Sequence, residues 1–338
     1  MKKYLNVKAT LICLGLAALV AVISVAALMM KPNNENNNDD YTKKTTLFSM
    51  GEKCMTLDEA FFVTKNRQAY YEEYYHTYGT SFSWDIPVEA GKTYEDIILD
   101  ECFLFTKQIF ILSEYAKDNG ITLTESEVKT IEAKVSSFMS ESDSKMLNGT
   151  KATDELVSRV YTRTALYDKV VEQILEGKDL TIDNEEARQC YVAITEINPE
   201  YFDSPERIAE KIAERVNSGE GIGTVSSIYD TSIEKIYVGK NSSIKKEMID
   251  FCLSLKDDEC KITSIDGVYF VVYCYMENDE TETKNVKEVL LEEKKVSYIN
   301  EFVSNLEKEN PVTVNTEAWD TINFDKPIYT KEDIIQSK

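Results

Sequence analysis

The chain has 338 residues, and its 60 acidic and 38 basic side chains give a formal net charge of −22. Nucleic acids are bound through clustered lysine and arginine, so this charge excludes a broad nucleic-acid interface. His76 is the only histidine, so a metal site built from several histidines is excluded, and a Ser-His-Asp triad would have to pass through this one residue. No glycine-rich loop follows a strand in the way a phosphate-binding site requires. We therefore expect no cofactor and no bound metal.

Residues 9–30 contain no charged side chain and follow three lysines. A membrane-spanning helix needs roughly 20 apolar residues, so we expect a single-pass anchor here, with residues 1–8 as a cytoplasmic tail. The alternative is a cleaved signal peptide, which would leave a secreted protein. Residues 31–46 are polar and aperiodic, which predicts a flexible tether. The bulk of the chain would then lie outside the cytoplasmic membrane.

Residues 47–183 show the apolar periodicity of a helical domain, in a chain whose 43% hydrophobic content predicts a packed protein. Thr56 and Glu59 form a capping-box pattern at the start of a helix that continues to about Gly79. Four tyrosines recur along this helix at three- and four-residue spacing: Tyr71, Tyr74, Tyr75 and Tyr78. We interpret this stripe as core or a helix interface, although an exposed stripe would be an adhesive surface for unfolded chains.

The clearest amphipathic helix begins after Thr93. Its apolar positions alternate at four- and three-residue steps: Ile98, Cys102, Phe105, Ile109, Leu112 and Ala116. Gly120 ends this helix, and Thr124 and Glu127 form a second capping box for the next one. A further helix follows Thr153.

Residues 184–276 change to a mixed pattern. Cys190–Ile197 is apolar on both parities, which predicts a strand buried on both faces. Ser204 and Pro205 mark the start of a helix that Gly219 ends. A short helix, a strand and another helix follow, and an Asp266-Gly267 turn then joins two β-rich runs in a hairpin. The predicted order is β-α-α-β-α-β-β.

This order resembles a parvulin-type peptidyl-prolyl isomerase domain. The resemblance is carried by Ala209–Gly219, Tyr237–Gly239, Lys246–Leu255 and Asp266–Val272. Active parvulins place one histidine in the first strand and another after the glycine of the last hairpin. In this chain those positions fall near Ile194 and at Tyr269, and residues 184–276 contain no histidine. Whether the protein is an enzyme is therefore left open.

The resemblance implies a small set of candidate site residues. Asp230 and Tyr269 are the polar candidates for catalysis, because a twisted amide is stabilised by a few polar groups in a shaped pocket. Met248, Phe251 and Tyr269 are the candidates for substrate binding. Ordinary core packing is the favoured interpretation of Met248 and Phe251.

The chain beyond the tether resembles SurA- and PrsA-type extracytoplasmic chaperones. This resemblance is carried by Tyr70–Gly79, Lys107–Glu127, Asp183–Arg188 and Pro311–Asp320. It implies an α+β protein in which an N-terminal helical chaperone domain is completed by the C-terminal helix and tail, residues 277–338. The parvulin-like module, residues 184–276, is inserted between these two parts.

These features favour a membrane-anchored chaperone or foldase that binds unfolded exported polypeptides and carries a degenerate isomerase module. One alternative is an active peptidyl-prolyl cis-trans isomerase of the same architecture. A second is a non-catalytic envelope-assembly protein with one dedicated partner. Whether the chain forms a homodimer is left open.

The cysteines include no C-x-x-C pair, so zinc-ribbon and thioredoxin-like motifs are absent. We expect buried free thiols, which behave as small hydrophobic side chains. In an oxidising compartment, a disulfide among Cys252, Cys260 and Cys274 is the alternative.

Overall fold

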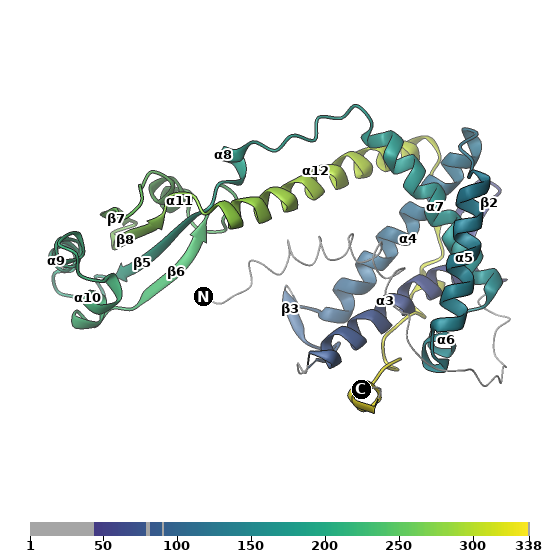
Figure 1. Ribbon diagram of the computed structural model, residues 1–338, viewed down its shortest axis with the longest axis horizontal. Coiled ribbons are helices and arrows are strands. Elements are labelled where there is room, and N and C mark those ends of the chain that lie inside the picture. Colours follow the sequence, from purple (N-terminus) through teal and green to yellow (C-terminus); the bar gives the residue numbers. More distant parts are fainter. Residues whose placement is uncertain (1–43, 79–81, 90, 337–338) are drawn as a thin grey trace. The chain divides into compact units, whose positions relative to one another are not determined.

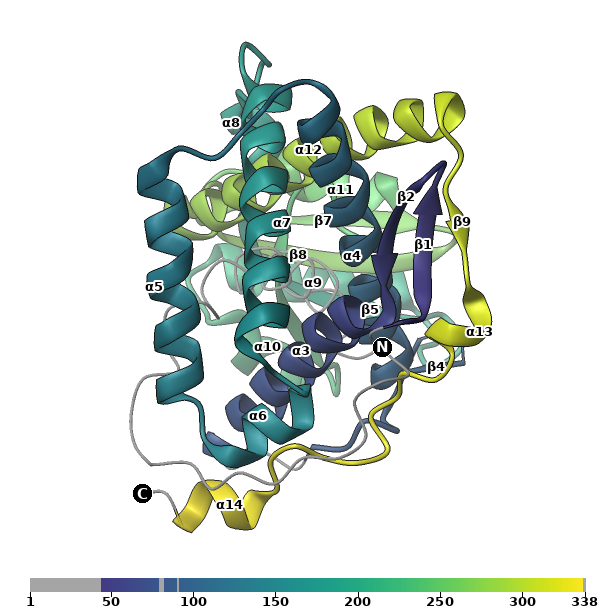
Figure 2. The same cartoon turned by 90° about the vertical axis from the view of Figure 1, so that its right-hand side faces the viewer.

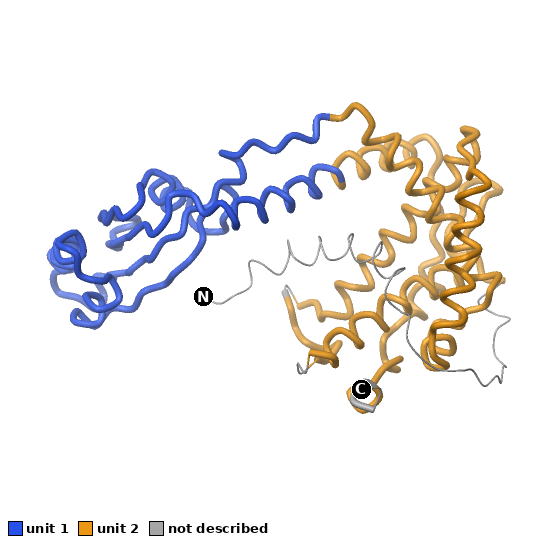
Figure 3. The backbone as a smooth tube through the Cα atoms, viewed as in Figure 1, with its two compact units in different colours: residues 1–13, 179–295 blue, residues 14–178, 296–338 orange. Residues whose placement is uncertain are grey.

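The computed structural model describes residues 44–78, 82–89 and 91–336 and is α+β, as predicted (Figure 1). Within these residues the chain divides into two compact units (Figure 3). Unit 1 holds residues 179–295, and unit 2 holds all the remaining described residues. Each unit has its own hydrophobic core.

The predicted membrane anchor, residues 9–30, lies outside the described residues, as do the predicted cytoplasmic tail and most of the tether. In the part of the chain that the structure describes, no helix is both long and apolar enough to cross a membrane.

Unit 2 is mostly helical and also contains short antiparallel strands. Its elements are β1 (Thr46–Met50), β2 (Lys53–Thr56), α3 (Leu57–Thr77), β3 (Pro87–Glu89), β4 (Lys92–Thr93), α4 (Tyr94–Asp118), α5 (Glu125–Glu141), α6 (Ser144–Thr150), α7 (Asp154–Leu175), the end of α12 (Glu280–Glu309), β9 (Thr313–Val314), α13 (Thr316–Trp319) and α14 (Lys331–Gln336). The capping boxes predicted at Thr56 and Thr124 are both present, so these helices begin where the sequence predicts.

The main core of unit 2 combines residues from distant parts of the chain. The predicted stripe of α4 is buried at Ile98, Cys102, Ile109, Leu112 and Ala116, and Phe105 is partly buried. Ile299, Val303, Ala318 and Ile322 pack into the same core from the C-terminal part. Strand β9 pairs antiparallel with β1, with Val314 opposite Phe48 (Figure 2). The end of α12 and the segment after it are therefore part of the same packed body as α4 and α7.

A buried ion network fixes how α3, α4 and α7 meet. The Arg163 guanidinium on α7 donates to Glu59 Oε1 on α3 at 3.0 Å and to Glu114 Oε1 on α4 at 2.6 Å. Arg159, one turn earlier on α7, pairs with Asp58 at 2.5 Å. Burying a charge is costly unless it is paired and hydrogen-bonded, so this network favours one arrangement of the three helices.

The C-terminal tail is bound to α3 through its backbone. A carboxylate oxygen of Glu72 accepts hydrogen bonds from the backbone N–H groups of Ile328 and Tyr329, both at 2.8 Å. The carboxamide of Gln68, one turn earlier, donates to the carbonyl of Lys326 at 3.0 Å. These bonds hold the second half of α3 against a segment that lies about 256 residues later in the sequence.

Unit 1 contains the predicted β-α-α-β-α-β-β order. Its elements are α8 (Asn184–Ala187), β5 (Cys190–Ile197), α9 (Pro205–Asn217), α10 (Ile222–Ile228), β6 (Ile233–Val238), α11 (Lys246–Leu253), β7 (Cys260–Ile265), β8 (Val268–Met276) and the first part of α12. The four strands form an antiparallel sheet in the order β6-β5-β8-β7.

Helices cover both faces of this sheet, so β5 is buried on both faces as predicted. Helix α11 packs on the face that contains Val192 and Val272. Helices α9 and α10 pack on the opposite face, which contains Ala193, Ile197 and Val271. Alternation along the strands thus divides the buried strand side chains of unit 1 between two separate cores.

All cysteines in the described residues are free, so the disulfide alternative is wrong for this structure. Cys252 and Cys274 lie in the core on the α11 side, whereas Cys260 lies in the core on the α9 side. The sheet therefore separates Cys260 from the other two. Burial raises the pKa of both the Cys252 and the Cys274 thiol to about 12, which keeps them protonated and weakly reactive.

A buried polar cluster lies between α3 and α4. Arg67 is only 6% exposed, and its Nη1 has no hydrogen-bond partner among the described residues. Its guanidinium lies 5.1 Å from the centre of the Tyr71 ring. Glu101 on α4 has one buried carboxylate oxygen that is also unpartnered within the described part. Burial raises the pKa of Glu101 from 4.5 to about 7, and the nearby charge of Arg67 opposes this shift.

We expect Glu101→Gln to change how the stability of unit 2 depends on pH. Between pH 4.5 and 7 the folded protein retains a proton on Glu101 that the unfolded chain releases, so this group makes the wild type less stable as the pH rises. Between pH 4.5 and pH 8 the free energy of unfolding of the wild type should fall by roughly 1–3 kcal/mol relative to that of the variant, because one pKa unit is worth about 1.4 kcal/mol.

Urea denaturation followed by tryptophan fluorescence measures this difference, because Trp84 and Trp319 both belong to unit 2. Glu132→Gln on the exposed side of α5 is the matched control. The difference in the free energy of unfolding between this variant and the wild type should be the same at every pH. If the difference in the free energy of unfolding between Glu101→Gln and the wild type is also independent of pH, the prediction is contradicted.

Candidate functional site

The two apolar candidates of the parvulin-like module, Met248 and Phe251, lie on α11. Met248 is 6% exposed, and Phe251 is partly buried beside it in the core between α11 and the sheet. Both side chains therefore fill space between a helix and the sheet, in agreement with the core-packing interpretation of these two residues.

The polar candidates lie elsewhere. Tyr269 stands opposite Ile197 in the register of β8 and β5, and its partly buried side chain packs in the core on the α9 side. Asp230 follows α10 in the left-handed backbone region at φ 55° and is exposed. The sheet thus lies between Tyr269 and the pair Met248 and Phe251, and the structure does not bring the predicted candidates into one pocket.

The positions expected for the two histidines of active parvulins are near Ile194 on β5 and at Tyr269 on β8. Ile194 packs on the α11 side of the sheet, whereas Tyr269 packs on the α9 side. In the described part of the chain, moreover, no group of three or more His, Cys, Asp or Glu side chains could hold a metal ion.

The predicted tyrosine stripe of α3 is divided between the core and the surface. Tyr71 is 5% exposed and packs edge-on against Tyr94, with ring centroids 5.7 Å apart. Tyr74 and Tyr78, by contrast, are 47% and 69% exposed. Together with the partly buried Tyr70 they form a stack at four-residue steps, with ring centroids 6.3 Å apart for Tyr70 and Tyr74 and 4.8 Å apart for Tyr74 and Tyr78. The prediction of a buried stripe is therefore wrong for Tyr74 and Tyr78, which lie at the C-terminal end of α3, where Tyr78 caps the helix.

A second row of tyrosines crosses the sheet of unit 1, and the sequence analysis did not identify it. This tyrosine ladder consists of Tyr237 on β6, Tyr191 on β5, and Tyr275 and Tyr273 on β8. Successive ring centroids lie 4.8, 5.2 and 4.9 Å apart. Tyr237 is 42% exposed, and the other three rings are partly buried. The sequence shows that two tyrosines of β8 lie at alternate positions and therefore on one face of the sheet. Which residues of β5 and β6 lie beside them depends on the strand register, which the sequence does not reveal.

Charged groups surround the tyrosine ladder. The Lys235 ammonium lies 4.9 Å from the centre of the Tyr275 ring. At one end the Tyr237 hydroxyl donates to Asp279 at 3.2 Å, and at the other the Tyr273 hydroxyl donates to Asp258 at 2.7 Å. The hydrogen bond to the Asp258 carboxylate raises the pKa of Tyr273 to about 12, so this hydroxyl stays protonated and can keep donating.

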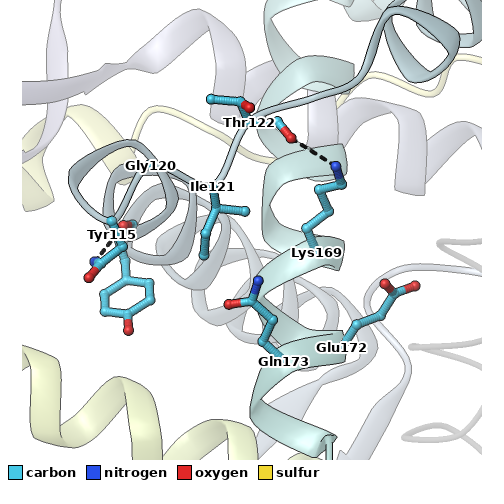
Figure 4. A pocket seen from close by; sticks show the side chains of 8 residues that line it. Tyr115, Gly120, Ile121, Thr122, Lys169, Glu172 and Gln173 are labelled. Atoms are coloured by element: carbon cyan, nitrogen blue, oxygen red, sulfur yellow. Dashed lines mark hydrogen bonds between the residues drawn. The ribbon is translucent and has the colours of Figure 1, made fainter.

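Unit 2 also contains an open hollow of about 660 Å³ beside α7 (Figure 4). It is lined by Tyr115, Asn119, Gly120, Ile121, Thr122, Lys169, Glu172 and Gln173. The Lys169 ammonium donates to the carbonyl of Thr122 at 2.8 Å and pairs with Glu127 at 2.7 Å. The side-chain bond from Lys169 lowers the pKa of Glu127 to about 2. Lys169 therefore joins the α4–α5 connection to α7, and we assign it a structural role.

Comparisons with known proteins give matches at the level of structure. No protein-family model matches the chain, and no curated protein matches it. A structure of a SurA-like chaperone from Campylobacter jejuni is 10% identical and covers 80% of this chain and 99% of its own, with a TM-score of 0.28. The foldase protein PrsA from Streptococcus pneumoniae is 12% identical and covers 70% of this chain and 97% of its own, with a TM-score of 0.25.

PrsA from Bacillus subtilis is also 12% identical and covers 69% of this chain and 92% of its own, with a TM-score of 0.23. These three structures are SurA-like chaperones and PrsA foldases, the group that the sequence resembles, and their TM-scores lie below 0.5.

Proposed function

We propose that this protein is an extracytoplasmic chaperone that binds unfolded exported polypeptides. The observation that carries the proposal is the exposed stack of Tyr70, Tyr74 and Tyr78 on α3. Aromatic rings left in water contribute little burial to stability, and contiguous exposed apolar surface usually marks an interaction site.

The chemistry of this stack suits transient binding of many sequences. A tyrosine ring covers apolar side chains, while its hydroxyl group can exchange hydrogen bonds with any exposed peptide backbone. Tyrosine also loses little side-chain entropy on binding. The net charge of −22 would keep such a protein from associating with itself through the same surface.

The proposal includes a domain arrangement. Residues 47–183 form a helical chaperone domain that residues 277–338 complete, and a parvulin-like module, residues 184–276, is inserted between them. The shared core of α4, Val303 and Ile322 supports the first part. The β-α-α-β-α-β-β order of unit 1 supports the second.

The double variant Tyr74→Ser/Tyr78→Ser tests the binding surface. It should lose more than about half of the ability to slow aggregation of a denatured client, because a few aromatic anchors usually supply most of the binding energy at an interface. Light scattering of a diluted, chemically unfolded protein measures the effect on the chain from residue 44 onward.

Tyr201→Ser is the matched control, because Tyr201 is 78% exposed and belongs to unit 1, whereas α3 belongs to unit 2. Circular dichroism should show that all variants keep the wild-type helix content. Equal suppression by the wild type and the double variant would refute the proposed surface.

We further propose that the parvulin-like module is at best a poor isomerase. Rotation about an Xaa-Pro bond has a barrier of about 20 kcal/mol, and an active site must place its polar groups around one twisted amide. Here no histidine occupies position 269 or the stretch of β5 around Ile194, and an isoleucine side chain cannot form hydrogen bonds.

The module should therefore barely accelerate the isomerisation of a short Xaa-Pro peptide above the spontaneous rate. A protease-coupled or NMR exchange assay measures this rate. Turnover comparable to that of an active parvulin, abolished by Tyr269→Phe or Asp230→Ala, would restore the interpretation as an enzyme.

The proposed location is the outer side of the cytoplasmic membrane, with residues 9–30 as the anchor. The uncharged run of these residues after three lysines supports it. A protease added outside intact cells should digest the chain beyond Lys31 and leave a membrane-bound N-terminal fragment. Recovery of the intact protein from the soluble cytoplasmic fraction would contradict this topology.

A further inference from the structure

The tyrosine ladder of unit 1 has the properties of a binding site for cations. We infer that it binds extended, positively charged segments of polypeptide through the rings of Tyr237 and Tyr275, which stack on either side of Tyr191. This inference rests on the proposed function, because it names the class of unfolded segment that one surface of the chaperone selects.

The first argument is that the ladder already holds a cation. The Lys235 ammonium lies 4.9 Å from the centre of the Tyr275 ring, within the roughly 6 Å over which a cation is attracted to the face of an aromatic ring. Lys235 and Tyr237 occupy alternate positions of β6 and therefore project from the same face as the ladder. The side chain of Lys235 thus stands where the side chain of a bound basic peptide would stand.

The second argument is charge complementarity. Asp279 accepts a hydrogen bond from Tyr237 at one end of the ladder, and Asp258 accepts one from Tyr273 at the other. Each carboxylate has further acceptor sites for an arginine or lysine side chain. Both acidic groups lie at the edge of an aromatic surface, which favours a cationic ligand and disfavours an acidic one.

The third argument concerns the shape of the ligand. The four rings form one continuous row across β6, β5 and β8, with neighbouring centroids about 5 Å apart. In an extended peptide every second side chain points to the same side, at intervals of about 7 Å. Because the faces of Tyr191 are covered by its two neighbours, a segment with basic residues on one side can place one cation at the Tyr237 ring and another at the Tyr275 ring.

A purely structural role for the rings makes different predictions. Cross-strand aromatic pairs such as Tyr191 and Tyr237 stabilise a sheet by themselves. A stabilising role requires ring packing alone and gives no part to Lys235. A binding role makes Lys235 an internal competitor, whose removal should strengthen binding of an external cation.

The experiment measures fluorescence anisotropy of a fluorescein-labelled peptide of alternating arginine and serine, titrated with the chain from residue 44 onward at low salt. The same peptide with citrulline in place of arginine keeps the shape and the hydrogen-bonding atoms but removes the charge. We expect the arginine peptide to bind and the citrulline peptide to bind at least about fivefold more weakly.

Two matched pairs of variants locate the site. Tyr275→Leu should weaken binding about three- to tenfold, whereas Tyr275→Phe, which keeps the ring, should stay within about twofold of the wild type. Lys235→Met should strengthen binding severalfold. Lys246→Met removes the same charge from α11 on the other face of the sheet and should have a smaller effect. Thermal melting should show that each variant is folded.

Several outcomes would overturn the inference: no binding of the arginine peptide, equal binding of the citrulline peptide, or equal effects of Lys235→Met and Lys246→Met. The Tyr74→Ser/Tyr78→Ser variant separates this inference from the proposed function. If that variant and the wild type bind the peptide but neither slows aggregation, the chaperone proposal alone fails. If the wild type slows aggregation but does not bind the peptide, only the inference about the ladder fails.

Discussion

The arrangement of unit 2 depends on the buried guanidinium of Arg163. It donates to Glu59 on α3, to Glu114 on α4 and to the carbonyl of Cys54 on β2, so one side chain on α7 connects three other elements. Removing one member of a buried ion network typically costs 3–5 kcal/mol, because an unpaired charge is left inside the protein. The network sits at the first turn of α3 and fixes where this helix begins relative to α4 and α7.

The second half of α3 is held by a different device, the backbone of the C-terminal tail bound to Glu72. Helix α3 is therefore attached near both of its ends, and Tyr74 and Tyr78 project from its last two turns. A rigid support favours binding at a weak site, because side chains that are already ordered in the folded protein lose little further conformational entropy when a ligand binds. The buried side of the same turns, with Tyr71 against Tyr94, supplies part of that rigidity.

The two tyrosine surfaces differ in chemistry. The stack on α3 presents rings from one helix, and no carboxylate is hydrogen-bonded to the hydroxyl groups of Tyr74 and Tyr78 among the described contacts. The ladder of unit 1 is built from three strands and carries a carboxylate at each end and an ammonium over one ring. Under the two proposals, the stack would bind apolar segments of an unfolded chain and the ladder would bind basic ones.

The sequence by itself determined the elements whose signals are local. The capping boxes at Thr56 and Thr124, the stripe of α4 and the strand β5 buried on both faces all follow from periods of two or 3.6 residues and from short-range hydrogen bonds. Only the tertiary structure decided which tyrosines of α3 reach water, that the sheet separates Tyr269 from Phe251, and that Lys235 meets the Tyr275 ring. These outcomes depend on strand register and on contacts between distant segments, such as Glu72 with Ile328, and such contacts leave no periodic trace in the sequence.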